Sequence, residues 1–377
     1  MSSTIPNHHQ KSLPVHPFSM SFTLASSIAE KSSQLSTSFN KRFESVFPLT
    51  SPFNKPRYQT FAKQALSSVL GGISYFHGTW LVDRTTHHSY DEEDEDFWVS
   101  AHEARQTSTG AHLEGPAELF TSTPSRPFFP RGFYWDEGFH LLPIGKWDND
   151  LGLEIMKSWF GLMDEDGWIA REQILGEEAR SKVPAEFQTQ YPHYANPPTL
   201  LMAVASFIER LQQTADKGVK SDYGQDVLGV EDMFSDKVTR RYLDNPELAK
   251  HYLMELYPLL QRHLEWFRRT QAGDIKVWDR EAFSMKEGYR WRGRTPDHCL
   301  TSGLDDYPRA RPPHTGELHV DLLSWMGFFA RTLKGVAEYL GQTEDVAELA
   351  KMENAIIRNL DGKSLHLTYT DGRFTLE

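Results

Sequence analysis

Five stretches of helical hydrophobic periodicity most constrain the fold, and most of them are joined by segments of roughly 30 to 40 residues rich in aromatic and charged side chains. The periodic stretches are residues 151–163, 199–211, 246–269, 318–340 and 344–360. Asn245 before Pro246 is typical of a helix start, and Gly341 follows the fourth stretch as a helix end. Strand-like alternation is rare and short. The sequence therefore predicts an all-α fold whose chemistry lies on the intervening segments.

The N-terminal part differs in character from the rest. Residues 1–35 are rich in Ser, His and Pro without sustained periodicity, so we expect a mobile tail or a linker remnant there and a partial catalytic domain over residues 36–377. Residues 57–77 show helical spacing through Phe61, Leu66 and Val69. Residues 91–96 are all carboxylates, which would suit Ca²⁺ but are more often a solvated loop. We expect about seven or eight helices and find no internal repeat, which argues against a solenoid.

Composition removes several function classes. The net charge of −12 disfavours binding to nucleic-acid backbones, and 12% aromatic residues argue against general disorder. The single cysteine, Cys299, excludes an intrachain disulfide and a multi-cysteine metal site. The 377-residue sequence has no apolar run long enough to span a bilayer and no apolar core of a signal peptide.

Three segments carry candidate catalytic side chains: residues 125–140, 166–198 and 291–325. Their candidate residues are Trp135, Asp136, Glu137, Arg171, Glu172, Asp305, Asp306, Glu317 and Asp321. Carboxylates interleaved with Trp and Arg suit glycoside hydrolysis, in which one carboxylic acid protonates the leaving oxygen and a second activates water or attacks the sugar.

Structural explanations compete for each segment. Residues 135–138 could be a helix N-terminus, residues 302–308 an ordinary turn, and Glu317 with Asp321 a helix-capping pair. His298, His314 and His319 lack the spacing of metal ligands, so we predict no metal site.

Within these segments the sequence resembles glycoside hydrolase family 63. The resemblance rests on FFPRGFYWDEGFHLLPI (128–144), DGWIAREQILGEEARSKVPAEF (166–187), YPHYANPPTLL (191–201), SGLDDYPRA (302–310) and GELHVDLLSW (316–325), and it extends from about Phe39 to the last residue. It implies an (α/α)₆ toroid without a cofactor. It also implies inverting hydrolysis of the outermost α-1,2-linked glucose of the N-glycan precursor in the endoplasmic reticulum.

The resemblance also implies roles for individual residues. Asp305 in SGLDD is expected to be the general acid, with Asp306 as its rival. Trp135, Asp136 and Glu137 are expected to bind the released glucose, and Arg171 and Glu172 to line the same pocket. Glu317 and Asp321 are expected either to touch the substrate or to orient Asp305.

Family members carry further segments: a cytoplasmic tail, a transmembrane helix, an N-terminal β-rich domain and a C-terminal continuation. We therefore expect a domain truncated at both ends, attached to a membrane only through segments outside it, with an N-linked oligosaccharide as its partner. The general base is expected beyond Glu377, and about four of the twelve toroid helices with it. The alternatives are a trehalase-like toroidal hydrolase and a carbohydrate-binding remnant without activity.

Overall fold

The computed structural model describes residues 25–85, 110–216, 239–295, 297–309, 313–314 and 316–361, and the strands β5 (Leu367–Thr370) and β6 (Arg373–Leu376). The chain divides into two units, Met1–Asn54 and Lys55–Glu377.

The first unit contains one long helix, α1 (Ala25–Val46). Phe43 packs between Phe39 and Phe47, with ring centroids 6.3 and 5.6 Å apart. The boundary expected at residue 35 falls within α1, whose first half is residues 25–35. Ala, Glu, Lys and Gln favour a helix even where the apolar residues do not form a continuous stripe.

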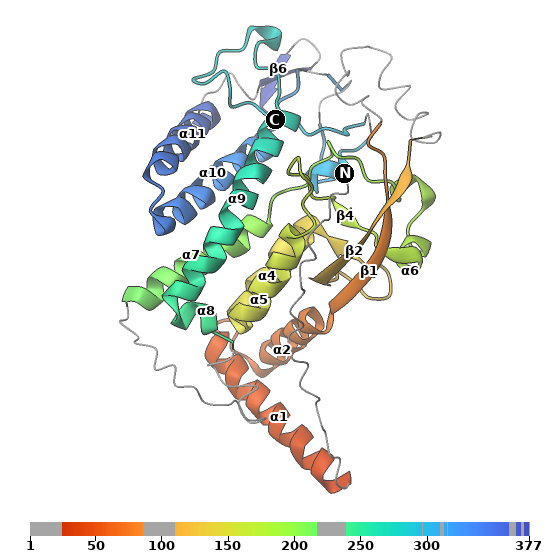
Figure 1. Ribbon diagram of the computed structural model, residues 1–377, viewed down its shortest axis with the longest axis vertical. Coiled ribbons are helices and arrows are strands. Elements are labelled where there is room, and N and C mark those ends of the chain that lie inside the picture. The colour runs from red at the N-terminus through yellow and green to blue at the C-terminus, as the bar shows by residue number, and fades with distance from the viewer. Residues whose placement is uncertain are drawn as a thin grey trace, which may run out of the picture. The chain divides into compact units, whose positions relative to one another are not determined.

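The second unit is mostly helical, as predicted (Figure 1). Its helices are α2 (Pro56–Gly71), α4 (Tyr134–Trp147), α5 (Asn149–Phe160), α6 (Gly176–Ser181), α7 (Leu200–Asp216), α8 (Arg241–Asp244), α9 (Pro246–Thr270), α10 (Val320–Leu340) and α11 (Thr343–Asp361). Short 3₁₀ turns lie at Ala185–Phe187, Val277–Asp279 and Leu300–Ser302. Its other strands are β1 (Ile73–Val82), β2 (His112–Ser122), β3 (Gly132–Phe133) and β4 (Glu172–Gln173).

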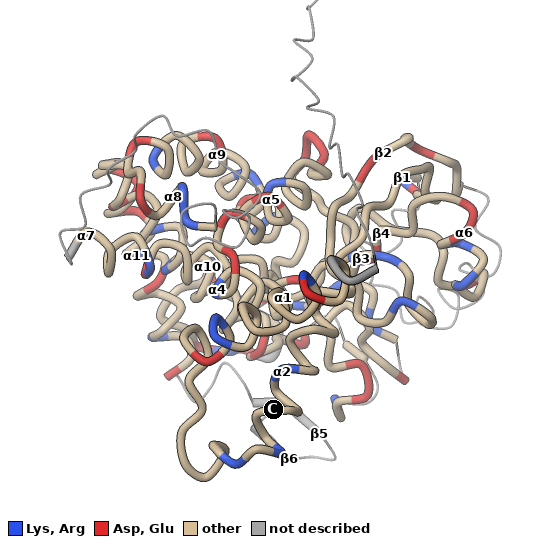
Figure 2. Tube along the Cα trace, turned by 90° about the horizontal axis from the view of Figure 1, so that it is seen from below, with Lys and Arg blue, Asp and Glu red and all other residues tan. Residues whose placement is uncertain are grey.

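The core lies between the long helices. α10 packs against α7, α9 and α11, and α4 packs against α5 and α7. Trp159, Trp266 and Trp291 are almost completely buried there. Burial of such large apolar side chains is the main stabilising contribution to a helical layer of this kind. Figure 2 shows that residues of both charges are distributed along the elements, including α9.

The five periodic stretches correspond to α5, α7, α9, α10 and α11. The predicted start of α9 is confirmed, because the Asn245 side chain accepts a hydrogen bond from the Leu248 amide at 3.2 Å. The predicted end of α10 at Gly341 is also confirmed. In the described ranges, eight α-helices have at least 12 residues, in line with the expected number.

Two sequence interpretations need correction. The helix expected over residues 57–77 ends at Gly71, and Ile73–Val82 forms a strand paired antiparallel with β2. β-branched and aromatic residues favour this extended ribbon once the helix has ended. The segment 125–140, expected to lie between helices, contains the start of α4. The acidic run at residues 91–96 lies outside the described residues.

Candidate active site

Two short strands join the first two candidate segments. β3 pairs antiparallel with β4, placing Gly132 opposite Gln173 and Phe133 opposite Glu172. One residue further along, the Tyr134 amide donates to the Arg171 carbonyl at 2.9 Å. The start of α4, with Trp135 and Asp136, therefore lies beside the Arg171–Glu172 pair.

The third segment meets the other two at Arg171 and Trp135. Arg171 Nη1 donates to the carbonyl oxygen of Leu300 at 3.1 Å. The Trp135 ring lies against the Cα of Gly303, where a Cβ would come within 2.8 Å of the indole. Gly303 has a φ of 72°, so it permits both this close approach and the turn that leads to Asp305. The structure thus brings all three predicted segments together.

Glu172 is held between two guanidinium groups. Its Oε2 accepts from Arg131 Nε and its Oε1 from Arg171 Nη2, both at 2.8 Å. The carboxylate is 5% exposed, so the two arginines compensate a charge that would be costly to bury alone. Sequence reasoning placed Arg131 in the segment but gave it no role; its position in the PRG sequence just before β3 was the available signal.

Two carboxyl groups at this junction resist ionisation. Partial burial raises the pKa of Asp136, with Glu172 adding to the rise and His140 and Arg171 opposing it. Burial also raises the pKa of Asp305, an effect that Arg171 opposes and the adjacent Asp306 reinforces. A carboxyl group that keeps its proton closer to neutral pH is suited to general acid chemistry.

Glu137 does not face this junction. Its side chain is fully buried, and it accepts from the Ser122 amide and contacts His140 Nδ1, both at 3.1 Å. The carboxylate therefore ties α4 to β2 inside the protein and is not brought to the junction with Trp135 and Asp136. The helix-start explanation of this segment is confirmed, since Asp136 and Glu137 lie in the first turn of α4.

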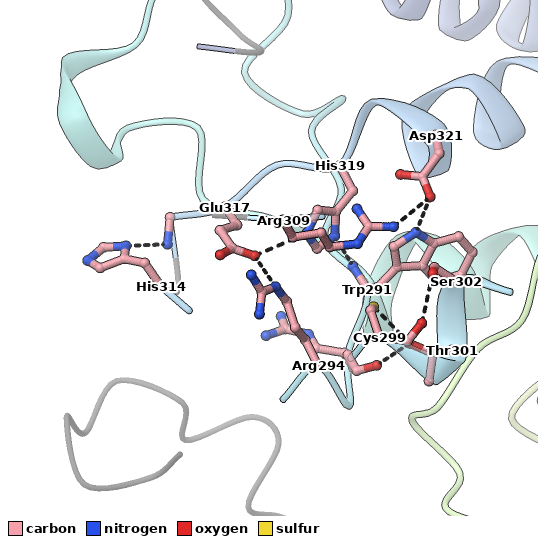
Figure 3. A network of polar contacts seen from close by, with 12 residues as sticks. Trp291, Arg294, Cys299, Thr301, Ser302, Arg309, His314, Glu317, His319 and Asp321 are labelled. Carbon is pink, nitrogen blue, oxygen red and sulfur yellow. Dashed lines mark hydrogen bonds and ion pairs between the residues drawn. The ribbon is translucent and has the colours of Figure 1, made fainter. Parts of the chain in front are cut away.

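Glu317 and Asp321 belong to a buried polar network (Figure 3). Arg294 Nε lies 2.6 Å from Glu317 Oε2, and His319 Nε2 lies 3.2 Å from the same oxygen. The Trp291 amide donates to His319 Nδ1 at 2.9 Å, so the imidazole proton is on Nε2 and points at Glu317. Burial raises the pKa of Glu317, although Arg294 opposes the rise.

Asp321 holds the other half of the network. Its Oδ2 accepts from Trp291 Nε1 at 2.9 Å and from Arg309 Nη2 at 3.1 Å. Burial alone would raise the pKa of Asp321, but the combined effect of Arg309, His319 and the Trp291 hydrogen bond outweighs burial and lowers this pKa. Asp321 is in the first turn of α10 and Glu317 precedes the helix, whose N-cap His319 makes no capping bond with its side chain. The pair is therefore not a helix cap.

The network braces the segment that carries Asp305. Trp291 precedes Asp305 and Arg309 follows it, and both side chains donate to Asp321. The chain on either side of Asp305 is therefore bonded to the start of α10. Within the segment, the Cys299 amide donates to the Asp305 carbonyl at 3.1 Å and closes the turn. Glu317 Oε1 and Asp321 Oδ1 are buried and make no hydrogen bond to any residue that the structure describes.

A cleft of about 650 Å³ adjoins this junction. Arg171 and Leu300 form part of its wall, and Phe187, Tyr191 and Tyr194 supply aromatic surface. Apart from Arg171, the wall contains no predicted site residue. The aromatic run in YPHYANPP was the sequence signal for it.

Comparison with known sequences decides the family. Residues 23–375 match the C-terminal domain of glycosyl hydrolase family 63. The chain belongs to that family. A "Probable mannosyl-oligosaccharide glucosidase" of Schizosaccharomyces pombe is 52% identical over 336 residues, covering 86% of this chain and 40% of the relative.

Two further relatives are similar over most of this chain. The "Mannosyl-oligosaccharide glucosidase" of Saccharomyces cerevisiae is 45% identical over 316 residues, covering 80% of this chain and 36% of the relative. "Alpha-glucosidase 2" of Arabidopsis thaliana is 35% identical over 326 residues, covering 83% of this chain and 35% of the relative. The chain thus spans 40% or less of the length of these relatives. No helix among the described residues is long and apolar enough to cross a membrane.

Proposed function

We propose that this family 63 domain hydrolyses a terminal α-1,2-linked glucose of an N-linked oligosaccharide, with Asp305 as the general acid. The main support is the junction itself, where the turn carrying Asp305 meets Arg171 through Leu300 and Trp135 through Gly303. The raised pKa of Asp305 suits a proton donor. The names of the two fungal relatives supply the substrate class.

The neighbouring side chains fit a glucose pocket. Trp135 offers an aromatic face for the sugar ring, and Asp136 can accept hydrogen bonds from its hydroxyls. Arg171 and Glu172, already bonded to one another, form a rigid charged wall. Asp306 adds negative charge beside Asp305 and helps it to keep its proton.

Glu317 and Asp321 act mainly on the position of Asp305 in this proposal, because their network holds both ends of its segment. Inverting hydrolysis places a water-activating carboxylate about 6.5–9.5 Å from the acid. We assign that base to no described residue. The relatives' names, which specify a mannosyl-oligosaccharide substrate, support a role in N-glycan processing, for which we propose the lumen of the endoplasmic reticulum.

The test compares two leaving groups. Asp305→Asn should abolish glucose release from a Glc-α1,2-Glc-α1,3-Glc trisaccharide but retain release from α-glucosyl fluoride, because fluoride departs without protonation. Asp361→Asn, an exposed carboxylate at the end of α11, is the matched control and should change neither rate. Equal loss on both substrates would contradict the general-acid role of Asp305.

A second function has one specific observation in its favour. Glu137, Glu172 and Glu317 are all buried and bonded inside the protein, so none is an open candidate for the base. The domain could then bind sugar without hydrolysing it alone. In that case neither substrate releases glucose, whereas deoxynojirimycin still binds and Asp136→Asn weakens that binding.

A further inference from the structure

The cleft beside Arg171 has an aromatic wall fixed in place by its neighbours. The Tyr191 and Tyr194 rings lie 5.0 Å apart between centroids, and His193 packs edge-on against Tyr194 at 4.7 Å. Gly293 has a φ of 79°, and a Cβ there would meet the Tyr194 ring at 2.8 Å. The Tyr194 ring therefore packs directly against the backbone of Gly293, which fixes its orientation without a ligand.

The rest of the cleft wall is polar. Thr301, Gln190 and His298 line it, together with the exposed residue Glu186. Flat aromatic faces with hydrogen-bonding groups between them are the surface that a sugar needs, because its CH groups stack and its hydroxyls bond.

The cleft lies next to the bond that the proposed acid would protonate. Arg171 and His298 line the cleft, and both exert their charge on the Asp305 carboxyl. Trp135 approaches the same turn at Gly303 and does not line the cleft. A general acid protonates the oxygen between two sugars, so it needs one sugar on each side. With glucose against Trp135, the cleft receives the other sugar.

We propose that this cleft binds the sugars on the leaving-group side of the cleaved bond, with Tyr191 as their stacking platform. This inference rests on the proposed function and deepens it. Tyr191 and its neighbours then determine specificity, because they make an oligosaccharide bind more tightly than a simple glucoside. A ligand the size of one glucose fills the Trp135 pocket and leaves the cleft empty.

Titration calorimetry tests the proposal with two probes. Deoxynojirimycin reports on the glucose pocket alone, and the trisaccharide reports on pocket and cleft together. All variants carry Asp305→Asn in the full chain, so that bound trisaccharide is not cleaved. Tyr191→Ala should weaken trisaccharide binding about tenfold, equivalent to ~1.4 kcal/mol, and leave deoxynojirimycin binding unchanged. Tyr191→Phe keeps the ring and should keep trisaccharide binding.

Two controls separate this inference from the proposed function. Phe283→Ala removes an aromatic ring that is 61% exposed and does not line the cleft, and should change neither affinity. Asp136→Asn should weaken both probes. Suppose that Asp136→Asn weakens the binding of both probes, but Tyr191→Ala weakens the binding of both equally or of neither. The assignment of the cleft is then wrong, and the assignment of the glucose pocket is retained. If neither probe binds before the cleft is altered, the inference and the proposed function both fall.

Discussion

Lowering the pH from about 7 to about 5 should destabilise this protein through one buried imidazole, that of His263. The ring is 2% exposed and surrounded by aromatic side chains. Its Nδ1 lies 2.7 Å from the Gly167 carbonyl and must carry the proton, so its Nε2 accepts from the Tyr134 hydroxyl at 2.7 Å. Both nitrogens of the neutral ring are hydrogen-bonded. A second proton, on Nε2, would point at the Tyr134 hydroxyl, which in the neutral state is the donor to that nitrogen.

Burial lowers the pKa of His263 from 6.5 to about 4. The unfolded chain therefore binds a proton on this ring below about pH 6.5, whereas the folded chain does not until about pH 4. The stabilisation of the folded state by the neutral ring is present above about pH 6.5 and is lost as the pH falls toward about 4. Linkage over this window gives a loss of about 1.8 kcal/mol in the free energy of unfolding between about pH 7 and about pH 5.

Urea unfolding of the wild type and of His263→Gln measures this loss. Glutamine cannot be protonated, so the stability advantage of the wild type should shrink by about 1.8 kcal/mol between the two pH values. Taking the difference cancels the carboxylates that titrate in both proteins. His77→Gln, at an exposed position in β1, should leave the pH dependence unchanged. Parallel pH profiles for the wild type and His263→Gln would refute the reasoning.

Two other changes test the site, and a third is a control. Gly303→Ala should destabilise the fold by about 1–3 kcal/mol and weaken deoxynojirimycin binding, because the left-handed backbone resists a side chain and the new methyl group displaces Trp135; unchanged calorimetric affinity would contradict the contact. Arg294→Met should cost about 3–5 kcal/mol in urea unfolding, because it leaves Glu317 buried without its ion pair. Lys157→Met breaks an exposed ion pair and should cost less than about 1 kcal/mol; a similar cost for both would argue against burial as the cause.

Sequence patterns predicted the long helices because their determinants are local. The start of α9 needs only Asn245, Pro246 and the apolar spacing that follows, and all of these lie within a few turns. The end of α10 likewise depends on Gly341 alone. The β1–β2 ribbon was missed, because each strand is stabilised by a partner about 40 residues away and neither alternates cleanly between buried and exposed positions.

The candidate site was predicted in part. The residue types pointed to Trp135, Asp136, Arg171 and Asp305, and the structure places their segments together. The sequence could not say that Glu137 points inward, because that depends on which face of α4 meets the Ser122 amide. The cleft was missed for a similar reason, since it forms only where segments far apart in sequence meet.

The Arg171–Leu300 hydrogen bond joins residues 129 positions apart, which has a consequence for protein synthesis. At ribosomal speeds, roughly 6 to 26 s pass between the addition of the first residue and that of the second. During that interval the growing chain has the Trp135 half of the pocket but no turn bearing Asp305. If the proposed pocket binds glucose, a sugar mimic added to cells would protect only chains in which both halves are present, and it would not rescue chains that misfold before the Asp305 turn is made.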